Sequence, residues 1–107
     1  MNNLKIKSDK IIGYFGDTTK VPMEIFIQDL GWIIILREEV ENVTDNWFTS
    51  SKYNASTIEK VDVEGQVLKL TNVYKANASF ADNEKNLKYN LTFDEIYIST
   101  DKVVAYF

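Results

Sequence analysis

The chain has 107 residues, a formal net charge of −4, and neither cysteine nor histidine. The lack of cysteine excludes disulfides and thiolate metal sites, and the lack of histidine removes the commonest metal ligand and general base near neutral pH. The acidic balance disfavours direct binding to nucleic acid, which needs clustered Lys and Arg. The length predicts one domain, residues 1–107, and roughly 65% burial of the unfolded surface. We therefore expect a non-enzymatic protein without cofactor or metal.

The N-terminus has no apolar stretch typical of a secretory signal, and the longest apolar run, residues 32–36, is too short to span a bilayer. These features predict a cytoplasmic protein without membrane contact. Frequent Asn, Lys and Ile are typical of an AT-rich bacterial or phage gene.

The first predicted element is a β-hairpin. Residues 4–7 alternate between apolar and polar side chains, and a polar turn separates them from the apolar residues 11–15. Such a pair of short runs is typical of two strands joined by a turn.

Residues 22–31 fit two structures. As a helix, Met23, Phe26, Ile27 and Leu30 would share one face and Gly31 would cap the C-terminus. As a hairpin, strands over residues 23–28 and 32–38 would flank a turn at 29–31. The density of Ile and Phe in a short segment favours the hairpin.

Residues 32–36 are apolar on both faces, which predicts an interior strand covered on both sides. Arg37 follows beside an acidic run, and we expect its guanidinium to pair with Glu39 or a cross-strand carboxylate.

Residues 41–57 lose the strand pattern and predict a long loop with at most one helical turn. This loop carries Trp47, Phe48 and Tyr53. Long loops in compact domains are often functional, and three aromatic residues close together either fold back on the core or dock on a partner.

Residues 58–74 predict a second hairpin. A two-residue loop at Glu64–Gly65 would place Lys60 opposite Lys69, which is unfavourable. A four-residue loop over residues 64–67 would instead place Asp62 opposite Lys69 and Val61 opposite Leu70. We therefore predict the second register.

The last fifth of the chain predicts core strands. Residues 87–93 alternate strictly, and the pattern then changes phase, so Asp94 and Glu95 should lie at a bulge, a corner or a turn. A final hairpin about residues 100–101 would have two packed faces. On the alternative interpretation, Tyr97 and Tyr106 form an exposed platform for a ligand.

The predicted fold is all-β, or β-rich with at most one short helix, as a small antiparallel β-sandwich or barrel of about seven strands. An apolar terminal strand ending at Phe107 would allow a homo-oligomer to form through edge strands.

The predicted function is binding to a protein with a basic surface, through aromatic residues surrounded by carboxylates. The predicted partner-binding residues are Trp47, Phe48, Tyr53, Glu38, Glu39, Glu41 and Asp45. A phage-encoded inhibitor of a host nucleic-acid-handling protein would act in this way, and so would a virion or assembly subunit. The alternative is a small carbohydrate-binding β-domain that uses exposed aromatic residues.

A third hypothesis is a carboxylate-only or Ca²⁺-assisted hydrolase. Its best site would be Asp62 and Glu64, which lie two residues apart on one predicted strand face.

Overall fold

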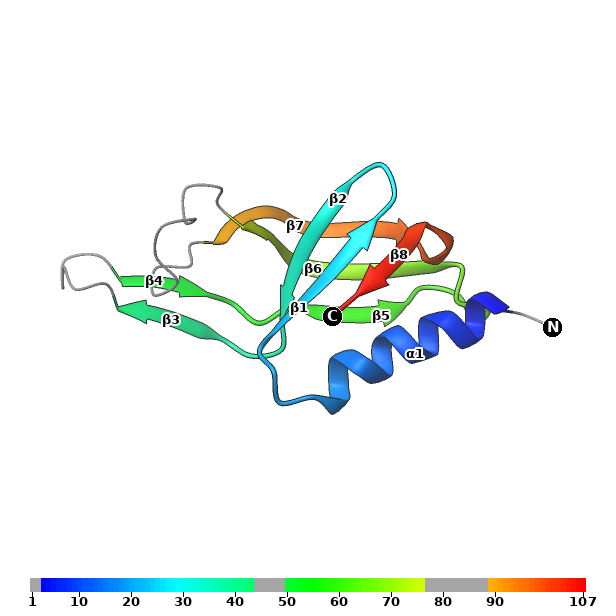
Figure 1. Ribbon diagram of the computed structural model, residues 1–107, viewed down its shortest axis with the longest axis horizontal. Helices are drawn as coiled ribbons and strands as arrows, with labels where there is room; N and C mark the ends of the chain where they lie inside the picture. The colour runs from blue at the N-terminus through cyan, green and yellow to red at the C-terminus, as the bar shows by residue number, and fades with distance from the viewer. Residues whose placement is uncertain (1–2, 44–49, 77–88) are drawn as a thin grey trace.

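The computed structural model describes residues 3–43, 50–76 and 89–107 (Figure 1). Within these ranges the chain forms one α-helix, one short 3₁₀ helix and eight strands. The elements are α1 (Asn3–Asp17), β1 (Pro22–Ile27), β2 (Gly31–Leu36), β3 (Val40–Val43), β4 (Ser50–Tyr53), β5 (Thr57–Lys60), β6 (Val67–Ala76), β7 (Tyr89–Ser99), η3 (Thr100–Lys102) and β8 (Val103–Tyr106). The prediction of a small antiparallel β-rich fold is confirmed. Its single α-helix has 15 residues and is longer than the short helix that was expected.

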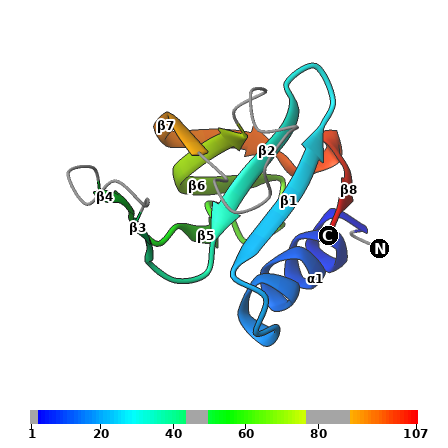
Figure 2. The same cartoon turned by 60° about the vertical axis from the view of Figure 1, so that its left-hand side comes forward.

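A curled antiparallel sheet forms the body of the molecule. Its strand order is β5-β6-β2-β1-β8, and β7 pairs with the other edge of β6. Strands β3 and β4 form a separate two-stranded sheet that extends away from this body, which we call the arm (Figure 2).

The main core lies on the inner, concave face of the curled sheet and is almost entirely aliphatic. It contains the buried side chains of Ile11, Met23, Ile25, Ile27, Ile33, Ile35, Ile58, Leu68, Leu70, Val73, Ile98 and Val103. Burial of these side chains supplies the main driving force for folding.

The hairpin predicted for residues 22–31 is confirmed. Strands β1 and β2 pair from Pro22 opposite Leu36 to Ile27 opposite Gly31. The turn uses positive φ angles at Asp29 (72°) and Gly31 (91°), the region that Gly and Asx residues tolerate best.

The interior position predicted for residues 32–36 is also confirmed, because β2 lies between β1 and β6. Ile33 and Ile35 belong to the main core, whereas Ile34 and Leu36 belong to a second buried cluster with Tyr53 and Tyr74.

The N-terminal hairpin prediction is wrong, because residues 3–17 form α1. Ser8 and Ile11 are buried, and Phe15 packs against the main core, so the buried positions follow helical spacing rather than alternation. Glycine is required at position 65, whose φ is 72°, since a Cβ there would lie only 2.1 Å from the Ser8 hydroxyl of α1.

Helix α1 lies along the opening between β5 and β8, the two ends of the main strand order. An ion pair joins Asp9 to Lys60 of β5 at 2.6 Å, and the rings of Tyr14 and Tyr106 lie 5.3 Å apart. The helix therefore covers the gap that the curled sheet leaves open (Figures 1 and 2).

The expectation that Arg37 pairs with a carboxylate is wrong. Its guanidinium donates to the carbonyls of Tyr14 and Phe15 at 3.0 and 2.7 Å, and to those of Lys20 and Pro22 at 2.6 and 3.2 Å. The last turn of α1 contains no basic side chain, so the cation that complements its C-terminal carbonyls comes from the end of β2.

The predicted register of the second hairpin is wrong as well. Strands β5 and β6 pair with Glu59 opposite Lys69 and Ile58 opposite Leu70, joined by the six residues 61–66. The Asp62 carboxylate organises this turn, because it accepts hydrogen bonds from the backbone N–H groups of Gln66 and Val67, each at 3.0 Å. Side-chain-to-backbone hydrogen bonds of this kind set the length of the turn, and cross-strand charge pairs alone do not reveal them.

The loop predicted over residues 41–57 is wrong in its described part. Val40–Val43 and Ser50–Tyr53 are the paired strands of the arm, with Val40 opposite Tyr53 and Glu41 opposite Lys52. Their polar composition hid them from a search for apolar alternation. Residues 44–49 lie outside the described residues.

The change of phase predicted at Asp94–Glu95 is present. Phe93, Ile96 and Ile98 all pack against the main core, although one is odd-numbered and two are even-numbered. On the paired strand β6, the side chains in the main core change from an even-numbered position, Leu70, to an odd-numbered one, Val73. Asn72 lies between them and has a φ of 50°. Asn72 therefore marks a crease across β6 and β7.

The final hairpin prediction is wrong. Strand β7 pairs with β6, whereas β8 pairs with β1, and η3 turns the chain from one position to the other. The prediction of two packed faces is wrong too, since the side chain of Tyr97 is 57% exposed.

Candidate functional site

The residues predicted to bind a partner do not gather at one described surface. Glu38, Glu39 and Glu41 are exposed at the start of the arm, and Glu39 forms an ion pair with Lys52 at 2.7 Å. Trp47, Phe48 and Asp45 lie outside the described residues.

Tyr53 is a core residue of the arm's base and is only 9% exposed. Its ring stands perpendicular to that of Tyr74, with the ring centres 5.7 Å apart. The Tyr74 hydroxyl donates to the carbonyl of Asn54 at 3.0 Å, and burial raises the pKa of Tyr74 above its ordinary value. Tyr53 therefore anchors the arm to the body and presents little surface to a partner.

A different aromatic cluster lies on the outer face of the sheet. The ring centres of Phe26 and Trp32 are 5.2 Å apart in an edge-on arrangement, and those of Trp32 and Phe107 are 5.6 Å apart with planes inclined by 31°. These residues come from β1, β2 and the position after β8, and we call them the aromatic platform.

Strand alternation explains why the platform faces outward. In β1 the side chains of Met23, Ile25 and Ile27 are buried, so Phe26 lies on the opposite face. Trp32 is its cross-strand partner in β2. Phe107 is held beside β1 by two backbone hydrogen bonds with Glu24, of 3.0 and 2.8 Å.

Much of the platform is open to solvent. Trp32 is 47% exposed and Phe107 is 54% exposed. In β8, Val104 is also exposed, at the irregularity that interrupts the pairing of this strand with β1. A sequence signal for the platform existed, because Phe26 is an aromatic residue between Glu24 and Gln28 on the otherwise polar face of β1.

Charged groups surround the platform. Glu24 is exposed in the same strand as Phe26. In the adjoining turns, Asp29 and Lys102 form an ion pair at 3.6 Å, and the Lys75 ammonium approaches the Leu30 carbonyl at 3.4 Å. An apolar centre with charged groups around it is the general anatomy of a protein interface.

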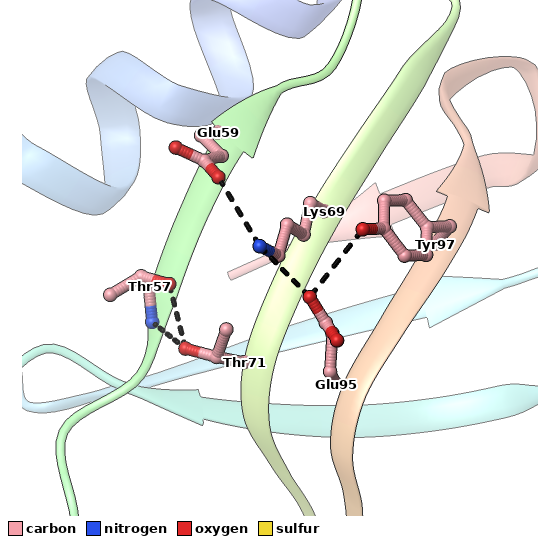
Figure 3. Close-up of polar contacts among 6 residues, drawn as sticks. All are labelled: Thr57, Glu59, Lys69, Thr71, Glu95 and Tyr97. Atoms are coloured by element: carbon pink, nitrogen blue, oxygen red, sulfur yellow. Dashed lines mark hydrogen bonds and ion pairs between the residues drawn. The ribbon is translucent and has the colours of Figure 1, made fainter.

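The outer face over β5, β6 and β7 is polar and its groups are paired with one another (Figure 3). The Lys69 ammonium lies 2.8 Å from Glu95 and 3.8 Å from Glu59, and the hydroxyls of Thr57 and Thr71 are 2.6 Å apart. We call Thr57, Glu59, Lys69, Thr71, Glu95 and Tyr97 the polar face.

The ionisation of the polar face follows from the Lys69–Glu95 contact. Hydrogen bonding and charge attraction to Lys69 lower the pKa of Glu95, and the same contact with Glu95 raises the pKa of Lys69. Both groups are held in their charged forms near neutral pH.

The carboxylates proposed for a hydrolase are poorly suited to that role. The backbone N–H of Gln66 is the main cause that lowers the pKa of Asp62, whereas a general acid needs a raised pKa. The described residues contain no group of three Asp or Glu side chains placed to hold a metal ion.

A cavity of about 370 Å³ lies beside Arg37 and is lined by Phe15, Thr18 and Val21 among others. Most of the guanidinium N–H groups are already bonded to carbonyls, so little donor capacity faces the cavity.

The helices in the described part of the chain are neither long nor apolar enough to cross a membrane. Comparison of the chain with protein-family models, with curated proteins and with solved structures finds no match. The aromatic platform is therefore identified as the candidate site on its geometry alone.

Proposed function

We propose that this protein is a non-enzymatic binding protein that recognises a partner protein through the aromatic platform. The observation that carries the proposal is the set of three contacting rings from β1, β2 and the residue after β8, of which two are about half exposed. Large aromatic side chains are enriched at the energetic centres of protein interfaces, where they bury much area at little conformational cost.

The scaffold beneath the rings supports the proposal. Strands β1 and β2 form six consecutive cross-strand pairs, and their inner-face side chains belong to the fully packed core. A rigid support lowers the entropy that an aromatic side chain loses when it binds.

The expected partner has a basic surface. The chain carries a net charge of −4, and Glu24 is exposed beside the platform. The exposed Glu24 carboxylate and the negative net charge favour a partner with Lys or Arg beside a complementary apolar patch. Inhibition of a nucleic-acid-handling protein and assembly into a larger particle are both forms that such binding would take.

The test is affinity capture from lysate of the native cell with an N-terminal tag, which leaves Phe107 unmodified, followed by mass spectrometry. Trp32→Ala should lose the macromolecule that the wild type retains. Val63→Ala, which removes exposed apolar surface in the β5–β6 turn, is the matched control and should retain it. Equal retention by the wild type and Trp32→Ala would contradict the proposal.

A parallel Trp47→Ala variant tests the loop residues predicted from the sequence. Loss of capture with Trp47→Ala but not with Trp32→Ala would move the site to that loop. Repeating the capture at rising salt tests the charge argument, because attraction between exposed charges weakens as ionic strength increases.

Carbohydrate binding is the second candidate, and one observation favours it. Trp32 and Phe107 are each about half exposed and their planes are inclined by only 31°, and exposed aromatic faces of this kind can stack on a sugar ring. The chain has two tryptophans, so in a Trp47→Phe background the fluorescence of Trp32 reports on the platform alone. A salt-insensitive fluorescence change on addition of polysaccharides would favour this candidate over a protein partner.

A further inference from the structure

Strand β7 leaves one long edge unpaired within the described part of the chain. It extends over Tyr89–Ser99 and pairs with β6 along one edge, with no described strand on the other. Exposed strand edges of this length usually pair with another chain or are blocked by charges, bulges or covering elements.

The other two sheet margins are covered, which singles out β7. Strand β5 is joined to α1 by the Asp9–Lys60 ion pair, and β8 contacts α1 through the Tyr14–Tyr106 ring pair. In Figure 1, β7 lies on the side of β6 away from β5 and α1.

Part of β7 is itself blocked. The register shift between Val73 and Tyr74 leaves Thr92 in a bulge, where its hydroxyl donates to the Asn90 carbonyl at 3.1 Å. The regular segment that can accept another strand is therefore the second half of β7, residues 95–99.

We propose that β7 pairs with β7 of a second copy of this chain, antiparallel and two-fold symmetric, with Tyr97 opposite Tyr97. Strand addition at an open edge gives main-chain hydrogen bonds, and side chains on the two faces select the register. The sequence of residues 95–99 is self-complementary in this register.

In an antiparallel pair, a residue whose backbone N–H and C=O point toward the partner strand lies opposite a residue that does the same. Such residues alternate along a strand, so the two-fold axis that relates two copies of β7 must pass through a residue and not between two residues. Centring on Tyr97 places Ile96 opposite Ile98 on the inner face and Glu95 opposite Ser99 on the outer face. The half-buried Ile96 would then be covered by an apolar neighbour.

The neighbouring registers are less favourable because of charge, polarity or the length of the paired segment. Centring on Glu95 places two carboxylates opposite each other, and centring on Ile98 pairs only residues 97–99, because η3 begins directly after Ser99. Centring on Ile96 places Asp94 opposite Ile98. In the Tyr97 register, by contrast, Glu95 lies opposite the uncharged Ser99 and keeps its ion pair with Lys69 of its own chain, 2.8 Å away.

The first test is sedimentation equilibrium of the purified full chain at increasing concentration. The wild type should shift from monomer to dimer, and Tyr97→Glu should raise the dissociation constant at least about tenfold, because like charges then face each other. Leu91→Glu, an exposed position of the same strand before the bulge, is the matched control and should dimerise like the wild type.

The second test uses single cysteines in a chain that has none. Tyr97→Cys should form a disulfide dimer under mild oxidation, since directly opposite Cα atoms lie within the range that a disulfide spans. Glu95→Cys and Ser99→Cys should not cross-link alone, because each lies about 13 Å from its own copy along the strand. A mixture of these two variants should cross-link.

A monomer at every concentration would overturn the proposal. A dimer that Tyr97→Glu leaves intact but Trp32→Ala dissociates would also overturn it, by placing the contact at the aromatic platform. A Glu95→Cys chain that links to itself would show a different register. The dimer and the partner-binding function are independent, because their variants lie on different strands.

Discussion

The outer face of the curled sheet has two regions that differ in how much apolar surface they expose to water. On the polar face, over β5, β6 and β7, Lys69 is held between Glu59 and Glu95, and the threonine hydroxyls bond to each other. On the aromatic platform, over β8, β1 and β2, Trp32 and Phe107 leave about half of their side-chain surface exposed.

The difference shows where to look for function on a small sheet. Polar groups that are hydrogen-bonded to one another within the chain gain little free energy from a partner, because few of their donors and acceptors remain available. Exposed aromatic surface gains free energy when another molecule covers it. The inner core supports both faces equally, so stability and recognition should separate in mutants.

The largest effect is expected at the inner core. Leu70→Ala removes a fully buried side chain beneath the polar face and should lower the free energy of unfolding by about 3 kcal/mol. Ile33→Ala, beneath the platform, is the matched variant and should cost a similar amount. Urea unfolding followed by circular dichroism measures both, and a marked difference would mean that the two halves do not share one core.

The next effect is expected at the crease where β6 changes phase between the two faces. Asn72→Val forces a β-branched residue to a φ of 50° and loses the Asn72 amide bond to Ala55, so it should cost about 2 kcal/mol.

Asn72→Gly loses the same hydrogen bond but tolerates the positive φ. It should therefore be clearly more stable than Asn72→Val in the same urea titration. If the two variants are equally stable, the backbone conformation at Asn72 does not limit the crease.

A smaller effect on stability is expected at the platform. Trp32→Ala loses ring contacts with Phe26 and Phe107 at a half-exposed position, which should lower the free energy of unfolding by only about 1 kcal/mol. The same variant should lose partner capture. A loss of stability as large as that of Leu70→Ala would reclassify Trp32 as a core residue.

The smallest effect is expected on the polar face and depends on pH. The pKa of Glu95 is lowered by Lys69, so the ion pair stabilises the fold above the ordinary Glu value of 4.5 and this contribution is lost as pH falls through the lowered pKa. The pKa of Lys69 is raised by Glu95, so the stabilisation from the ion pair is fully present below pH 10.5, the ordinary Lys value. It is lost as the pH rises through the raised pKa.

Glu95→Gln should therefore reduce the dependence of the urea midpoint on pH in both the acid and the alkaline range. Some acid dependence should remain, because the pKa of Asp62 is also lowered, mainly by the backbone N–H of Gln66. Glu59→Gln, whose partner lies farther away at 3.8 Å, is the control and should change the profile less. An unchanged profile in Glu95→Gln would show that the pair contributes nothing measurable.

Patterns of neighbouring residues in the sequence predicted the strands that are rich in Ile and are joined by a turn containing Gly or Asp. The β1–β2 hairpin and the interior position of β2 follow from Ile density, from Gly31 and from an apolar run with two faces. The same reasoning failed for α1, since Ile6 and Ile12 interrupt a clean helical stripe and short alternation resembled a strand.

The candidate site could be predicted only in part. An aromatic site was expected, and Trp47 and Phe48 remain a prediction outside the described residues, whereas Tyr53 is buried against Tyr74. The platform combines Phe26, Trp32 and Phe107, which come from three places in the chain. Only the pairing of β1 with both β2 and β8 brings them together.

By itself, the sequence determined the β-rich class, the absence of cysteine and histidine chemistry, and the β1–β2 hairpin, because these follow from composition and from neighbours within a few residues. Tertiary structure decided the role of Arg37, the position of β8 beside β1 and the formation of the platform. Those features depend on contacts between distant segments, such as Arg37 with the end of α1, and local alternation carries no information about which distant strand becomes a neighbour.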